Sequence, residues 1–220
     1  MRKLIVTEWM TLDGVVQSPS YPDEDPSGGF EHGGWHRAYF DDLSLNWVIE
    51  SVTAAGGYLL GRGTYENFAA HWPNASSEEQ VLAEPLNTRP KYVASTTLTE
   101  PLAWQNSTLL GQDVGDAVRA LKAEEGNPLL VIGSPGLVQL LIEHDLIDEL
   151  QLMIDPLVLG TGKRLFNHSD SDGGRLRALR LVESQQTSTG AIVAAYAAAN
   201  ERSPERVAAV RDEHRPGDEA

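Results

Sequence analysis

The segment with the sequence PLLVIGSPGLVQLLIEHDLIDELQLMIDPLVLGTGKRLF, residues 128–166, limits the possible folds more than any other part of the chain. Its first apolar run, Leu129–Ile132, is typical of a strand that is buried on both faces of a parallel sheet. Ser134 can cap a helix after that run, and Pro135 suits a first turn because no amide is needed there. A second apolar strand is expected at residues 149–154. A strand, a helix and a further strand in this order predict an α/β fold.

The rest of the chain continues this alternation of short apolar runs and helical patterns. We expect further strands at residues 3–10, 57–60, 91–94 and 107–110, helices at 35–52 and 113–126, and a closing strand pair at 176–183 and 191–198. Gly190 separates this last pair, so an antiparallel arrangement at a sheet edge is predicted. Residues 18–34 lack periodicity and are rich in Ser, Pro, Asp and Gly, which indicates a long surface loop. Loops of this length usually cover an active site or are disordered insertions.

Charge and cysteine content exclude several classes of protein. The formal net charge of −15 and the lack of a basic cluster argue against nucleic acid as a partner. The chain has no cysteine, which excludes disulfides, zinc–thiolate sites and a cysteine nucleophile. No apolar run suits a signal peptide or a membrane span, so we expect a cytoplasmic protein with no membrane partner. The composition favours one domain at residues 1–199 and a charged, flexible tail at 200–220.

Three predicted strand ends carry groups that suit an anion. They are Gly61-Arg62-Gly63-Thr64, Ser95-Thr96-Thr97 and Gly133-Ser134-Pro135-Gly136-Leu137. Amides at a helix start, hydroxyls and a guanidinium can all bind phosphate groups. Plainer explanations stay open: glycines that only permit tight turns, hydroxyls that cap a turn, and an Arg62 that pairs with surface carboxylates. If these ends meet at the carboxyl edge of one sheet, they would suit a long ligand with several phosphates, such as a dinucleotide.

Other motifs give negative signals. His32 and His36 have the spacing of helical metal ligands, but two glycines stand between them, and no metal site is predicted. The sequence Gly160-Thr161-Gly162-Lys163 lacks the first glycine and the final Ser/Thr of a P-loop. No G-x-S-x-G sequence is present, which argues against an α/β-hydrolase.

Five segments carry a family resemblance through their order and spacing. They are KLIVTEWMTLDGVVQ, YLLGRGTYENF, KYVAST, LLVIGSPGLVQLLI and LIDELQLMIDPLVLGTGKRLF, and together they span most of residues 3–166. With these segments the chain resembles the dihydrofolate reductase-like family, and most closely the branch of the riboflavin-biosynthesis deaminase-reductase C-terminal (reductase) domain. The resemblance implies a mostly parallel central sheet with helices on both faces and an antiparallel C-terminal strand pair. It also implies a homodimer.

The same resemblance implies an NADPH-dependent reductase that acts on a small pteridine- or pyrimidine-like heterocycle. The residues implied to bind the cofactor are Thr11, Asp13 and Gly14 over the nicotinamide, Gly61, Arg62, Gly63, Thr64, Ser95 and Thr96 at the phosphates and adenosine, and Gly133, Ser134, Gly136 and Leu137 at the pyrophosphate. Reduction of the ring also requires a proton, and Asp41 or Asp42 stands near the place of the family's pocket carboxylate, with Asp42 preferred. Both carboxylates can instead be groups that stabilise a helix start. The alternative function is a non-catalytic nucleotide- or small-anion-binding module on the same fold.

Overall fold

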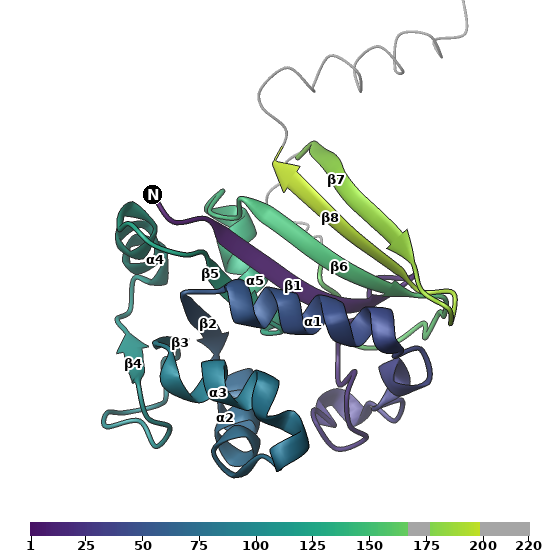
Figure 1. Cartoon of the computed structure of the whole chain (residues 1–220), viewed down its shortest axis with the longest axis horizontal. Coiled ribbons are helices and arrows are strands. Elements are labelled where there is room, and N and C mark those ends of the chain that lie inside the picture. Colours follow the sequence, from purple (N-terminus) through teal and green to yellow (C-terminus); the bar gives the residue numbers. More distant parts are fainter. Residues whose placement is uncertain (167–176, 199–220) are drawn as a thin grey trace, which may run out of the picture.

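An eight-stranded sheet in the order β4-β3-β2-β5-β1-β6-β8-β7 forms the centre of the computed structural model, which describes residues 1–166 and 177–198 (Figure 1). The strands are β1 (Leu4–Thr11), β2 (Gly57–Gly61), β3 (Lys91–Ala94), β4 (Ser107–Leu110), β5 (Leu129–Ile132), β6 (Glu149–Asp155), β7 (Leu179–Gln186) and β8 (Ile192–Ala198). Strands β1 to β6 pair in parallel, whereas β8 pairs antiparallel with β6 and β7. The predicted parallel sheet with an antiparallel closing pair at its edge is confirmed. The predicted tail at 200–220 lies outside the described residues.

Helices cover both faces of this sheet, as predicted. They are α1 (Asp42–Ala54), α2 (Arg62–His71), α3 (Gln80–Thr88), α4 (Val114–Ala123) and α5 (Pro135–Glu143). Helices α1, α2 and α3 pack on one face, in a cluster that includes Val52, Tyr65 and Leu86. Helices α4 and α5 pack on the other face, where Val118 and Val138 meet the β1 side chains Leu4 and Val6. Figure 1 shows α1 in front of the sheet and α5 behind it. Within the described ranges, no helix combines the length and apolar character that a membrane crossing requires.

The predicted single helix at residues 35–52 is wrong in its first part. Residues Trp35–Ala38 form a short 3-10 helix, and α1 begins only at Asp42. Between them, Asp41 has an extended backbone, and its side chain accepts a hydrogen bond from the Ser44 amide. An aspartate with an extended backbone that accepts from this amide is a helix N-cap. Phe40 and Asp41 therefore lie in the connection between the 3-10 helix and α1.

The predicted long loop after β1 has defined contacts with the body of the protein. The Gln17 side chain donates hydrogen bonds to the carbonyls of Asp25 (2.9 Å) and Ser27 (3.0 Å) and accepts one from the Lys163 amide (2.9 Å). The Trp35 indole in turn donates to the Gln17 carbonyl at 2.8 Å. Short 3-10 turns at Ser27–Gly29 and Trp35–Ala38 complete the loop. This buried glutamine therefore holds the loop against the edge of the sheet where the parallel strands end.

Candidate functional site

The order of the strands places a topological switch point at the carboxyl end of β5, where a crevice is expected. This strand lies between β2 and β1. The helices that follow β1 and β2 pack on one face of the sheet, whereas α5, which follows β5, packs on the other. Neighbouring parallel strands whose following helices lie on opposite faces leave a crevice at their carboxyl ends, where open α/β sheets bind ligands. The turn between β5 and α5 is therefore where a ligand is expected to bind.

Two of the predicted phosphate-binding corners meet at this turn. The Gly61 amide donates a hydrogen bond to Ser134 Oγ at 2.9 Å, which joins the end of β2 to the start of α5. Gly133 has a φ of +53°, and a Cβ added there would lie 3.3 Å from Thr64 Oγ1. The prediction that Ser134 caps α5 is wrong, because its hydroxyl is directed to Gly61 and to the Ile132 carbonyl (3.1 Å). Ser134 instead ties two corners together.

The first turns of α2 and α5 each carry a glycine with open space where a Cβ would stand. A Cβ at Gly63 or at Gly136 would meet no atom within 4 Å. The side chain of Leu137 is buried in the core on the α5 face, so only its backbone is available to a ligand. Helix starts present amides without intrahelical acceptors and a positive end of the helix dipole, which together suit a phosphate. The residues present therefore fit a nucleotide pyrophosphate at this crevice.

Arg62 connects the third predicted corner, at residues 95–97, with the first, at residues 61–64. Arg62 Nη1 donates to Thr97 Oγ1 at 3.2 Å, and both side chains are exposed. Ser95 Oγ accepts from the amides of Thr97 (3.1 Å) and Leu98 (3.0 Å), so this hydroxyl caps a turn. Thr96 is exposed, and Thr97 is the threonine beside Arg62. Arg62 and two hydroxyls thus form a polar surface at the ends of β2 and β3.

The turn after β1 is held by Asp13. Its carboxylate accepts hydrogen bonds from Thr11 Oγ1 (2.6 Å), the Gly160 amide (2.9 Å) and the Leu159 amide (3.2 Å), and it pairs with Arg164. Burial raises the pKa of Asp13, but these hydrogen bonds outweigh it and lower the pKa to about 2. Asp13 therefore joins the turn after β1 to the segment after β6. Gly14, with a φ of +83°, completes that turn.

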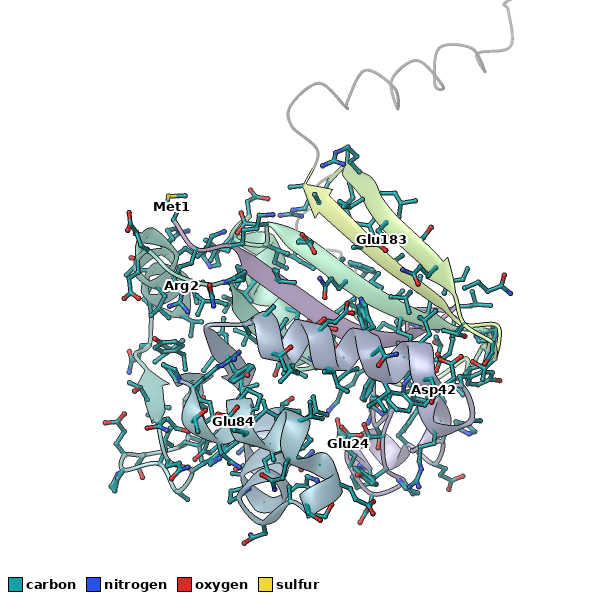
Figure 2. All side chains as sticks on the ribbon, in the orientation of Figure 1. Met1, Arg2, Glu24, Asp42, Glu84 and Glu183 are labelled. Atoms are coloured by element: carbon teal, nitrogen blue, oxygen red, sulfur yellow. The ribbon has the colours of Figure 1, made fainter. Side chains whose placement is uncertain are left out.

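The structure argues against Asp41 as a proton donor. Its carboxylate accepts hydrogen bonds from the side chain and amide of Ser188 (2.7 and 2.8 Å) and of Ser44 (2.9 and 3.0 Å). Hydrogen bonds from Ser188 and then Ser44 hold the pKa of Asp41 below its ordinary value. Asp42 is exposed in the first turn of α1, at the end of the helix nearest the β7–β8 turn (Figure 2). Its catalytic role stays a prediction.

Glu8 is a buried carboxyl group that was not among the candidate site residues predicted from the sequence. It is 5% exposed, and its Oε1 has no hydrogen-bond partner among the described residues. The register places Thr7 beside Ile132, the last residue of β5, so Glu8 follows at the level of the Gly133 turn. Burial raises the pKa of Glu8 well above its ordinary value, and the charge of Glu24 adds to this effect. A carboxyl group in such surroundings tends to keep its proton. The signal in the sequence was an acidic residue within the apolar run KLIVTEWM.

A buried polar pair lies at the same edge of the sheet. His36 Nδ1 and Asp155 Oδ2 are 2.7 Å apart, and the two side chains are almost fully buried. Burial raises the pKa of Asp155, although the hydrogen bond and charge of His36 oppose this. The absence of a metal site at His32 and His36 was an expectation from the sequence. The described part of the chain contains no group of three His, Asp or Glu side chains arranged to hold a metal.

Comparisons with known proteins agree with this architecture. The chain matches the RibD C-terminal domain over residues 2–193. It is 27% identical over 201 residues to the uncharacterized protein YyaP of Bacillus subtilis (strain 168), a match that covers 89% of this chain and 94% of that protein.

Two solved structures share the fold. A putative riboflavin biosynthesis protein from Shewanella sp. PV-4 superposes with a TM-score of 0.62 at 20% identity, covering 90% of this chain and 99% of the other. A pyrimidine reductase-like protein from Corynebacterium diphtheriae superposes with a TM-score of 0.57 at 12% identity, covering 91% and 93%. The dihydrofolate reductase-like fold expected from the sequence is thereby confirmed. With a match over nearly its whole length, the chain belongs to the RibD C-terminal domain family, which is riboflavin-biosynthesis reductase-like.

Proposed function

We propose that the protein is an NADPH-dependent reductase of a pteridine- or pyrimidine-like heterocycle. The observation that carries this proposal is the meeting of the glycine- and hydroxyl-bearing corners at one crevice. The Gly61–Ser134 hydrogen bond and the Arg62–Thr97 hydrogen bond connect the ends of β2, β3 and β5. A dinucleotide laid across these strand ends would meet helix amides, hydroxyls and one guanidinium in turn.

The cofactor would be held mainly by backbone groups, which suits a chain with a net charge of −15. The first turns of α2 and α5 would bind the phosphates, and Arg62 with Thr97 and Ser95 would bind the adenosine phosphate end. NADPH would supply hydride chemistry, and the protein would orient the ring and exclude water. Glu8, a buried carboxyl group with a raised pKa, is suited to hold the proton that reduction requires.

NADPH is expected to stabilise the protein against thermal unfolding, by about 2.7 kcal/mol at roughly a hundredfold excess over Kd. Arg62→Ala should weaken NADPH more than NADH, because only NADPH carries the additional phosphate. Arg119→Ala is the control, since Arg119 pairs with Asp116 on α4. Thermal shift titrations with both nucleotides measure these effects. No shift with NADPH or NADP would contradict the proposal, and equal losses for both nucleotides would contradict the role of Arg62.

A non-catalytic nucleotide-binding protein is the second candidate. The engagement of Asp41 by Ser44 and Ser188 and the exposure of Asp42 favour it, because neither carboxylate then serves as a buried acid. Single-turnover experiments with bound NADPH and a panel of dihydropterins and aminopyrimidines separate the two. Loss of NADPH absorbance supports the reductase, whereas tight binding without oxidation supports the binding module.

We also propose a homodimer formed through β7. Every residue of this edge strand is exposed, including the large apolar side chains Leu179, Leu181 and Val182. An exposed apolar edge strand is a liability for a monomer, and pairing with a second copy about a twofold axis would cover it. Leu181→Arg should yield a monomer in light scattering, whereas Val158→Arg, an equally charged change in an exposed loop, should leave a dimer. A monomeric wild type would refute this assembly.

A further inference from the structure

A groove lies between α1 and the β7–β8 hairpin, on the far side of β6 from the β5 turn (Figure 1). Its volume is about 380 Å³. Leu43 and Trp47 from α1 and Val193 and Ala195 from β8 form its apolar lining. The two side chains that β8 contributes are small, so they leave space beside the indole of Trp47. The groove therefore offers apolar surface on which a further segment can pack.

One carboxylate stands on each wall of the groove. Glu50 comes from α1 and Glu183 from β7, and both are exposed. Glu183 Oε1 accepts a hydrogen bond from Gln185 Nε2 at 2.8 Å, and a carboxylate can accept further bonds. None of the described residues that line the groove carries a positive charge. The groove therefore suits a segment with small apolar side chains between two cations.

The sequence that follows β8 contains such a segment. Residues 206–211 have the sequence RVAAVR. Successive residues of a helix advance by roughly 100°, so Val207 and Val210 would share the centre of one helix face. Arg206 and Arg211 would stand at the two margins of that face. The pattern of two valines between two arginines matches the apolar lining between two glutamates.

The end of β8 places this segment within reach of the groove. The strand ends at Ala198, and Val193 lies five residues earlier, which is about 17 Å back along the strand. Residues 199–205 can span at most about 24 Å when they are extended. Glu183 pairs with Ala195, so this carboxylate is nearer to the strand end than Val193 is. A segment that begins at residue 206 can therefore turn back to the groove of its own chain.

We propose that residues 204–213 dock as a helix in the groove of the same chain. Val207 and Val210 pack on the apolar lining, which removes apolar surface from water. Arg206 and Arg211 bind the carboxylates of the two walls through charge-assisted hydrogen bonds. Exposed ion pairs contribute little to stability, so the valines supply most of the affinity and the arginines fix the orientation. This inference does not depend on the proposed reductase function.

The test is paramagnetic NMR on the full chain. The chain has no cysteine, so Asp212→Cys provides a single position for a nitroxide label, on the side of the helix away from the valines. The expected result is strong broadening of the Trp47 indole N–H signal, which Trp47→Phe assigns. The Trp104 indole, which packs in the cluster of α2 and α3, is the internal reference and should broaden little.

Paired substitutions distinguish docking from chance contacts of a tethered segment. Val207→Asp combined with Val210→Asp should weaken docking at least about tenfold, because two buried valines are lost. Ala208→Asp combined with Ala209→Asp is the matched control. It adds the same charge on the other side of the helix and should keep most of the broadening. Equal broadening in the wild type and in the valine variant would refute the docking.

Exchange of the charges tests the two ion pairs. Glu50→Lys combined with Glu183→Lys should weaken docking about fivefold, because attraction becomes repulsion. Addition of Arg206→Glu and Arg211→Glu should restore the broadening. A disturbed groove would not be repaired by changes outside it, so restoration supports direct pairing. Failure of the fourfold variant to regain broadening, although it is folded, would refute the pairing.

The wild-type sequence with only the label can also overturn the inference, so it stays testable if a groove variant does not fold. Absence of broadening at Trp47 would refute the docking. A mixture of labelled protein and unlabelled ¹⁵N protein tests whether the segment reaches a second copy. Broadening of the ¹⁵N protein in that mixture would refute docking within one chain, whereas its absence supports it.

Discussion

The Gly162→Ala variant is expected to lose about 3 kcal/mol of unfolding free energy. Gly162 has a φ of +112°, and a Cβ there would lie 2.8 Å from both Phe30 Cε2 and Val15 Cγ1. Both neighbours are buried and pack with Trp35, so neither can move without disturbing that cluster. The backbone strain of a non-glycine residue adds to this crowding. Urea unfolding followed by circular dichroism would show a lower midpoint.

Gly160→Ala is the matched control for this variant. Gly160 also has a positive φ, +74°, but a Cβ there would meet no atom within 4 Å. Its substitution should cost about 1 kcal/mol, from backbone strain alone. Equal losses in the two variants would show that crowding at Phe30 and Val15 contributes nothing. An unchanged midpoint in Gly162→Ala would contradict the packing seen in the loop.

Glu8→Leu is expected to raise the unfolding free energy at neutral pH by about 2 kcal/mol, because it removes a buried carboxyl group whose Oε1 has no partner among the described residues. Glu8 lies on β1 between Val6 and Met10 and pairs across the sheet with Leu152. Stabilisation should come with a loss of reductase activity if Glu8 holds the proton for reduction. Denaturant unfolding and NADPH oxidation measure the two effects. A destabilised Glu8→Leu would show that the carboxyl has a structural partner.

The difference in unfolding free energy between Glu8→Leu and the wild type should depend on pH in a definite direction. Burial, and then the charge of Glu24, raise the pKa of Glu8 in the folded protein above its ordinary value of 4.5. The stability that Glu8 contributes is therefore complete below pH 4.5 and is lost as the pH rises through the folded pKa. The advantage of Glu8→Leu should grow over that range. Glu8→Gln should lose the same pH dependence, whereas Glu66→Leu, at an exposed position on α2, should keep it.

Most strand positions could be predicted because they depend on short local patterns, but β7, expected at 176–183, lies at Leu179–Gln186. The run LLVI at residues 129–132 became β5 at those bounds, and KYVA at 91–94 became β3. Apolar runs of this length are typical of strands that are buried on both faces of a parallel sheet, so the run itself indicates where the strand lies. The helix expected at 113–126 is α4, and Asp113 caps it, since its side chain accepts a hydrogen bond from the Asp116 amide.

The roles of individual side chains at the site could not be predicted from local patterns. Ser134 is of a residue type that commonly caps helices, but its hydroxyl accepts a hydrogen bond from the Gly61 amide, 73 residues away in the sequence. Asp41 and Asp42 were adjacent candidates. Ser44 engages Asp41 locally as part of the helix cap, but the further hydrogen bonds from Ser188 depend on where the hairpin lies. Such hydrogen bonds depend on which strand ends the topology brings together.

By itself, the sequence determined the order of the elements, the glycine-bearing corners and the family resemblance, since these depend on neighbouring residues. Only the tertiary structure decided that Glu8 is buried, with its Oε1 lacking a partner among the described residues, and that His36 meets Asp155 across 119 positions. Burial and pairing are properties of the folded chain, because they require segments far apart in sequence to exclude water from the same place.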